Sequence, residues 1–245
     1  ELIGRKALAV NLSDIAAMGA SPSHAVLTLL LPRHFSLADA KQLCSGIFEI
    51  AENYEVAIIG GDTNKWDGKL VIGATLIGHR SPSTTGWQIN GAQQSDRVVV
   101  SGSFGDSIHG HHLAFEPRIE LANYLAERYE IHAATDASDS LSLDLQLLAQ
   151  ASSVGVDIDA NKIPISDTLK TETTQSQLDG ALYDGEDFEL LLSTPTPPTE
   201  LPQLPPDIKL FPIGRLIDPA NRSGKSQITL ISPAGKTASI TPNGF

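Results

Sequence analysis

The sequence lacks the features that mark membrane, secreted or nucleic-acid-binding proteins. Its single cysteine, Cys44, cannot form an internal disulfide, which favours a reducing cytoplasm. It has no run of 18 or more apolar residues, so no membrane span is expected. The first residues, ELIGRKALAV, lack the basic start and cleavage site of a signal peptide. A net charge of −12 lacks the surplus of Lys and Arg that nonspecific binding to nucleic acid or anionic membranes requires.

Two common nucleotide-binding fingerprints are missing as well. The chain contains neither a GxxxxGK[ST] loop nor a GxGxxG motif, and it has no internal repeat of solenoid period. What is present is the composition of a globular protein, with 41% hydrophobic and 19% charged residues. A chain of 245 residues can form one large domain or two of ordinary size.

Hydrophobic periodicity predicts helices and strands in mixed order, and hence an α/β or α+β protein. Ser36 and Asp39 resemble a capping box at the start of one helix, and Gly19 is placed to end another. The polar run 171–177 is typical of a flexible loop, and the proline-rich segment 195–206 of a surface connection. The predicted helices are 3–18, 37–53, 117–129 and 139–152, and the predicted strands are 56–59, 69–79, 97–101, 131–135, 155–159, 187–193, 208–214 and 226–232.

Several aspartates occupy positions that folding alone does not require. Asp14 interrupts an apolar helix, where it either faces solvent or serves a function. Asp62 follows Gly60 and Gly61 at the predicted end of a strand, a pattern that suits a ligand loop but also an ordinary turn. Asp136 and Asp139 join a strand to a helix that Asp139 can cap.

Further carboxylates, Asp184, Glu186 and Asp187, surround Gly185 just before an apolar strand. Clustered carboxylates repel one another and resist leaving water, unless a hard cation such as Mg²⁺ occupies the site. Because Mg²⁺ usually comes with substrate phosphates, an acidic site beside a helix N-terminus suggests nucleotide phosphoryl transfer. The residue pattern alone leads no further than a magnesium–phosphate site.

A set of motifs extends the argument through resemblance to a family. In order along the chain, these motifs are GRKALAVNLSDIAAMGASP at 4–22, IGGDT at 59–63, VSGSFGDSIHG at 100–110, PRI at 117–119, the D-x-S-D segment at 136–139 and GEDFEL at 185–190. Together they resemble landmarks of the thiamine-monophosphate kinases, within the aminoimidazole-ribonucleotide synthetase-like superfamily. The resemblance implies a two-domain α/β architecture with an incomplete N-terminal domain, divided into residues 1–103 and 104–245.

The resemblance also implies an activity and a set of site residues. The activity is ATP-dependent phosphorylation of thiamine monophosphate to thiamine diphosphate by direct in-line transfer, with no side-chain nucleophile or base. The implied ligands of several Mg²⁺ ions are Asp14, Asp62, Asp136 and Asp139, and the implied ATP contacts are Gly61, Asp62 and Ser138. Glu186 and Phe245 match substrate-binding positions, although Phe245 is equally interpreted as a disordered terminal residue.

The sequence also departs from the family pattern. A family Gly-Asp-Asp stretch and a Thr-Asp segment are expected before Glu1, and the family homodimer is expected if that segment is present. Ile89 stands where the family has an ATP-contacting arginine, and Ser140 replaces a glycine. These departures leave two alternatives open: a sister ATP-dependent synthetase, or a degenerate nucleotide-binding protein that is not an enzyme. The histidines at 109–112 are interpreted as part of a solvated loop.

Overall fold

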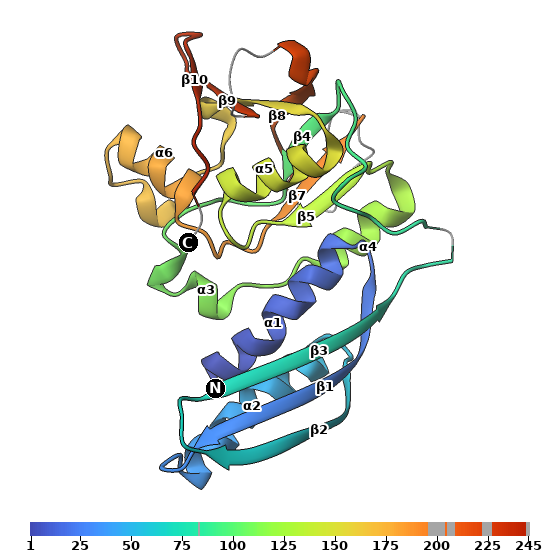
Figure 1. Cartoon of the computed structure of the whole chain (residues 1–245), viewed down its shortest axis with the longest axis vertical. Helices are drawn as coiled ribbons and strands as arrows, with labels where there is room; N and C mark the ends of the chain where they lie inside the picture. Colours follow the sequence, from blue (N-terminus) through green and yellow to red (C-terminus); the bar gives the residue numbers. More distant parts are fainter. Residues whose placement is uncertain (83, 196–203, 205–208, 222–226, 244–245) are drawn as a thin grey trace.

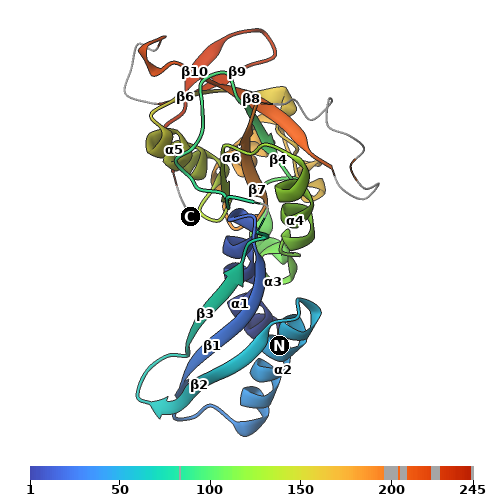
Figure 2. The same cartoon turned by 90° about the vertical axis from the view of Figure 1, so that its right-hand side faces the viewer.

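The protein consists of two α/β halves that meet along one helix. The computed structural model describes residues 1–82, 84–195, 204, 209–221 and 227–243. Figures 1 and 2 show a smaller half built on three strands and a larger half built on a wider sheet, with α1 (Leu2–Ala17) between them.

The smaller half is a three-stranded sheet with two helices on one face. The strand order is β2 (Ala57–Trp66), β1 (Ser21–Pro32), β3 (Val71–His79), with β1 parallel to β2 and antiparallel to β3. Helices α1 and α2 (Leu37–Asn53) pack on this sheet. The sheet's other face carries apolar side chains in solvent, because alternate residues of a strand point to opposite faces; the large ones are Val26, Ile59, Val71 and Ile77.

The larger half is a seven-stranded sheet covered by helices on both faces. Helices α5 (Leu141–Ser152) and α6 (Thr174–Tyr183) cover one face, and α4 (Ile119–Arg128) packs on the other over β4, β7 and β5. The short helix α3 (His111–Ala114) precedes α4. The strand order is β10 (Thr237–Ser239), β9 (Ile228–Ile231), β6 (Gly155–Asp159), β8 (Phe211–Ile217), β4 (Arg97–Val100), β7 (Leu190–Thr194), β5 (Ala133–Asp136).

Helix α1 contributes to two hydrophobic clusters. Leu8 and Leu12 are fully buried against α2 and the small sheet. One turn further on, Ile15 and Ala16 pack with α4 and β7 of the larger half. The helix ends at Met18, and Gly19 follows with φ +62°, the left-handed conformation that glycine adopts freely.

The structure confirms the mixed α/β class and most of the predicted elements. Helix α2 and strand β6 have the predicted bounds, and Ser36 caps α2 by accepting a hydrogen bond of 3.0 Å from the Asp39 amide. Strand β4 is hydrogen-bonded within the larger sheet, so the two sheets divide between residues 79 and 97. The division into domains at residue 103 remains a prediction.

Three predictions of local structure are wrong. Strand β1 was not anticipated, because Pro22 and Pro32 near its ends disguise a central strand. Strand β2 does not stop before the glycines; it continues through Gly60, Gly61 and Asp62. The run 171–177 is not a loop throughout, because α6 begins at Thr174 and Thr173 caps it. Most of the segment 195–206 lies outside the described residues.

Candidate functional site

The centre of the candidate site is the contact between α1 and the end of β5. Asp136, the last residue of β5, is buried, and its carboxylate accepts a hydrogen bond of 2.5 Å from the Ser13 hydroxyl on α1. The pKa of Asp136 is raised to about 6, chiefly by burial. The negative charges of Asp14 and Asp139 contribute to the increase, and the hydrogen bond from Ser13 opposes it. Three of the predicted aspartates are therefore electrostatically coupled.

Asp14 and Asp139 lie on the solvent side of this contact. Both residues are exposed, and burial of part of the Asp14 side chain raises its pKa. Asp139 does not cap α5, contrary to prediction. Ser140 is the N-cap, and its hydroxyl accepts a hydrogen bond of 3.1 Å from the Leu143 amide. Because the cap is supplied by its neighbour, the Asp139 carboxylate can bind a ligand instead.

Asp144 is a member of this acidic group that the sequence reasoning missed. It is buried, and its Oδ2 accepts hydrogen bonds of 3.1 Å from the amides of Asp139 and Ser140. Burial raises its pKa to about 7, and the charges of Asp139 and Asp136 add to the increase. The signal was present in the sequence, since Asp144 lies on the apolar stripe of α5, one residue before the buried Leu145.

Glu186 lies beside the 136–139 segment, as the backbone hydrogen bonds show. Its amide donates to the Ser138 carbonyl at 2.8 Å. The Glu186 carboxylate is paired with Lys6 of α1, whose Nζ lies 2.7 and 2.9 Å from the two carboxylate oxygens. Its backbone φ of +58° is left-handed, an uncommon conformation outside glycine that the surrounding hydrogen bonds hold in place. Site residues from α1, β5 and the loop before β7 are thus brought together.

Two further buried carboxylates support this loop: Asp187, which the sequence places in the acidic cluster around Gly185, and Glu189, which the sequence reasoning missed. Asp187 Oδ1 accepts a hydrogen bond of 3.0 Å from the Gly105 amide, and Oδ2 has no partner among the described residues. Glu189 is paired with Arg118 and accepts a hydrogen bond of 2.6 Å from the Ser101 hydroxyl. Their hydrogen bonds with Gly105 and Ser101 tie the segments 101–105 and 184–189 to one another.

Asp62 and Gly61 do not join the other predicted residues. Both are exposed on β2, an edge strand of the small sheet. The Asp62 carboxylate accepts hydrogen bonds from the Thr63 amide and the Asn64 side chain, and nothing in the described part of the chain links it to the acidic group at Asp136. Gly61 has φ +153°, and a Cβ there would meet the Leu27 carbonyl oxygen at 2.1 Å, so close strand packing by itself requires glycine. Phe245 lies outside the described residues.

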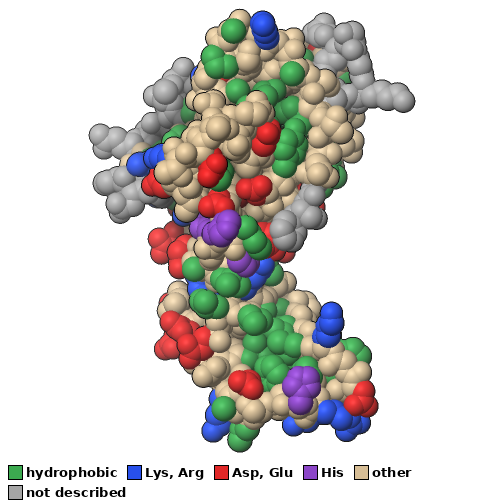
Figure 3. Space-filling view, turned by 90° about the vertical axis from the view of Figure 1, so that its left-hand side faces the viewer, with side chains coloured by type: hydrophobic (Ala, Val, Ile, Leu, Met, Phe, Trp, Pro, Cys, Tyr) green, Lys and Arg blue, Asp and Glu red, His purple; other side chains and the backbone are tan. Residues whose placement is uncertain are grey.

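Within the described ranges, no three His, Cys, Asp or Glu side chains converge closely enough to hold a metal ion by themselves. The histidines of 109–112 make local contacts instead: His109 pairs with Asp106, and His112 Nδ1 lies 2.8 Å from the Ser107 carbonyl oxygen. Figure 3 shows histidines and carboxylates together at the narrow region between the two halves.

Comparisons with known proteins assign the chain to a family. The AIR synthase related protein N-terminal domain matches residues 1–79, and the corresponding C-terminal domain matches residues 67–194. The thiamine-monophosphate kinase of Pyrococcus abyssi is 32% identical over 228 residues, which cover 87% of this chain and 70% of that protein. This chain belongs to the thiamine-monophosphate kinase family. The family's enzyme from Rhodopirellula baltica is 43% identical over 192 residues, or 77% of this chain.

Solved structures of the family agree with this assignment. The structure described as AaThiL complexed with AMPPCP and TMP has a TM-score of 0.82 and 28% sequence identity, and the match covers 99% of this chain and 79% of that one. The aligned part of the present chain spans 60% of the length of the Rhodopirellula baltica protein.

In the described part of the present chain, none of the helices combines the length and apolar character needed to cross a bilayer.

The structure also accounts for one departure from the pattern of the thiamine-monophosphate kinases. Ser140 has φ −178°, an extended conformation that does not require glycine. Its hydroxyl caps α5 and donates a hydrogen bond of 2.6 Å to the Asn243 carbonyl oxygen. The serine therefore adds two stabilising contacts where the family pattern has none. Ile89 is partly exposed and makes no comparable polar contact through its side chain.

Proposed function

We propose that this chain performs ATP-dependent phosphorylation of thiamine monophosphate to thiamine diphosphate, with Mg²⁺ as the metal. The observation that carries the proposal is the hydrogen bond from Ser13 of α1 to the buried Asp136 at the end of β5, which brings Asp14 into electrostatic contact with Asp136 and Asp139. A relative of the same family is described in complex with AMPPCP and TMP, a ligand pair that matches this reaction.

The acidic residues suit Mg²⁺ bound together with phosphate. Burial and mutual repulsion raise the pKa of Asp136 to about 6, and a divalent cation would relieve both penalties. Asp14, Asp136 and Asp139 would each contribute ligands to the Mg²⁺ ions that arrive with ATP, and phosphate oxygens would supply the rest of each octahedron, because Mg²⁺ rarely takes all its ligands from protein. Asp62 is retained in the proposal as a fourth ligand, on the basis of family resemblance alone. When bound, the metal would neutralise phosphate charge and align donor with acceptor.

The remaining residues have proposed positioning roles. Ser138 lies at the turn before α5, whose N-terminal amides and helix dipole favour an anion, and we assign it with Gly61 to ATP. Glu186 and Phe245 are assigned to the thiamine substrate. Lys6, paired with Glu186, adds a positive charge beside the acceptor position. We also propose that the two domains comprise residues 1–103 and 104–245.

The chemistry requires charge control rather than a side-chain nucleophile. The acceptor phosphate is already ionised at neutral pH, so its oxygen would attack the γ-phosphorus directly while the bond from that phosphorus to the β,γ-bridging oxygen breaks and ADP leaves. Two unit charges about 4 Å apart repel by about 4 kcal/mol at an effective dielectric near 20. Neutralising that repulsion and fixing the in-line geometry are therefore the main tasks of the site. The names of the relatives favour this reaction over that of a sister synthetase.

A cytoplasmic homodimer completes the proposal. The support for a dimer is the apolar outer face of the small sheet, where Ile59 and Ile77 are 60% and 53% exposed. A second copy of the chain is the proposed occupant of that face, and sedimentation equilibrium would measure the mass.

The substitution Asp139→Asn tests the metal role. Asp139 is exposed, so we expect the fold to survive while Mg·ATP binding weakens about tenfold or more, the loss typical of one charge-assisted contact. Calorimetry with Mg·ATP measures the binding, and a coupled assay for thiamine diphosphate measures turnover. The matched control is Asp67→Asn, which removes a carboxylate from a surface ion pair with Arg33. Unchanged binding and turnover in Asp139→Asn would remove Asp139 from the site.

A further inference from the structure

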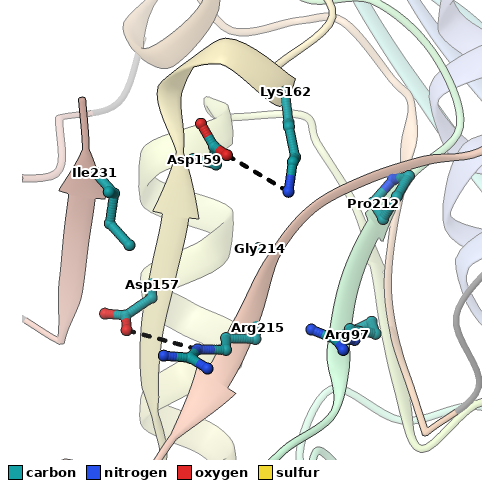
Figure 4. Close-up of a pocket in the computed structure, with 8 residues that line it drawn as sticks. All are labelled: Arg97, Asp157, Asp159, Lys162, Pro212, Gly214, Arg215 and Ile231. Atoms are coloured by element: carbon teal, nitrogen blue, oxygen red, sulfur yellow. Dashed lines mark ion pairs between the residues drawn. The ribbon is translucent and has the colours of Figure 1, made fainter. Parts of the chain in front are cut away.

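Among the described residues, no α-helix packs over part of one face of the larger sheet. On the face that carries α4, this helix packs over β4, β7 and β5, through contacts such as those of Val99 and Leu192 with Leu125. Side chains of β8, β6 and β9 on the same face border a hollow of about 360 Å³. Its size is in the range of small-molecule sites. Figure 4 shows the residues that line it: Arg97, Asp157, Asp159, Lys162, Pro212, Gly214, Arg215 and Ile231.

Two arginines lie side by side in this hollow. Arg97 on β4 and Arg215 on β8 are direct cross-strand partners, and on the next strand Asp157 is the partner of Arg215. Like charges directly opposite each other destabilise an antiparallel pair, unless an anion lies between them. The sheet register therefore creates a site of positive potential in a protein whose net charge is −12.

The charges are not balanced within the hollow. Arg215 Nε lies 4.0 Å from Asp157, and Lys162 Nζ lies 3.5 Å from Asp159. The Arg97 guanidinium makes no ion pair or side-chain hydrogen bond with another described residue. Among the lining residues that the structure describes, three cations face two carboxylates, which leaves one positive charge and the five donors of Arg97 available to a ligand.

We propose that this hollow binds a small organic phosphate, at a second site separate from the one proposed for phosphoryl transfer. The planar guanidinium groups of Arg97 and Arg215 suit bidentate contacts to phosphate oxygens. Pro212 and Ile231 provide apolar surface for the organic part of the ligand. The two aspartates disfavour ligands with several dispersed negative charges and so favour a single phosphate group.

Calorimetry with phenyl phosphate tests the site in the whole chain. EDTA is present and ATP absent, so that metal-dependent binding at the acidic group does not contribute. We expect saturable binding with a dissociation constant of about 1 mM or lower, weaker binding of inorganic phosphate, and a loss of about tenfold or more in both Arg97→Gln and Arg215→Gln. The control Arg33→Gln removes an exposed arginine of the small sheet and should bind as the wild type does.

Protection from chemical modification provides a second measurement on the unaltered chain. Phenyl phosphate should slow phenylglyoxal modification of Arg97 and Arg215 but not of Arg33, as followed by mass spectrometry. Binding that is absent in the wild type, or equal in wild type and both arginine variants, would overturn the proposal. So would binding that is lost in Asp139→Asn but kept in Arg97→Gln, because the phosphate would then occupy the other site. Preferential binding of a polyglutamate peptide would equally overturn it, in favour of a macromolecular partner.

Discussion

We predict that one buried carboxyl group, that of Asp187, makes the free energy of unfolding depend on pH between pH 5 and 8. The residue is 2% exposed, Oδ1 accepts the Gly105 hydrogen bond, and Oδ2 has no partner among the described residues. Burial raises its pKa from 3.8 to about 7, and the charges of Glu189 and Asp184 contribute to the increase. Asp187→Asn keeps an acceptor for Gly105 and removes the charge.

The sign and size of the effect follow from linkage between protonation and folding. A carboxyl group whose pKa is raised on folding contributes most to stability below its unfolded pKa of 3.8, and this contribution is lost as the pH rises through about 7. Each pH unit within that window changes the free energy of unfolding by about 1.4 kcal/mol. Between pH 5 and 7, Asp187→Asn should therefore gain about 2 to 3 kcal/mol relative to the wild type, and little more above pH 8.

Urea unfolding followed by tryptophan fluorescence at pH 5, 6, 7 and 8 measures this difference. The matched control is Asp67→Asn, whose side chain is 76% exposed and should show no such slope. A difference between Asp187→Asn and the wild type that is constant across these pH values would refute the argument from burial. A difference that shrinks with rising pH would do so as well.

Two further substitutions test the packing and the cap. Leu12→Ala should lower the free energy of unfolding by about 2 to 5 kcal/mol in a denaturant titration, because Leu12 is fully buried. The control Leu37→Ala changes a side chain that is 72% exposed, and it should change the free energy of unfolding by less than about 0.5 kcal/mol. Ser140→Ala removes the α5 cap and the hydrogen bond to Asn243, and should cost about 1 to 2 kcal/mol; a melting temperature equal to that of the wild type would show that water replaces both contacts.

Local signals in the sequence were enough to predict most helices and strands. The capping pattern of Ser36 and Asp39 predicted the start of α2, and the structure confirms it. The failures occur where tertiary contacts override local preference. Gly60 and Gly61 favour a turn, but hydrogen bonding to β1 extends the strand through them. The polar start of α6 has weak periodicity, and the cap at Thr173 stabilises it instead.

Local signals in the sequence also predicted part of the candidate site. Asp136 and Asp139 are near neighbours in sequence, so their proximity required no knowledge of the fold. The approach of Asp14 depends on how α1 packs against β5, and the Ser13–Asp136 hydrogen bond that fixes it joins residues 123 positions apart. No local pattern encodes such a contact. The pairing of Lys6 with Glu186 and that of Arg97 with Arg215 were out of reach for the same reason.

The position of α1 has a consequence for the whole molecule. Its first turns complete the core of the small sheet and its last turns that of the larger half, so neither half keeps an intact interior when the helix separates. Melting should therefore be a single cooperative event, and cutting the chain between the two sheets should not release a larger half that folds by itself. The same helix carries Ser13, whose hydrogen bond to Asp136 places Asp14 beside the larger half.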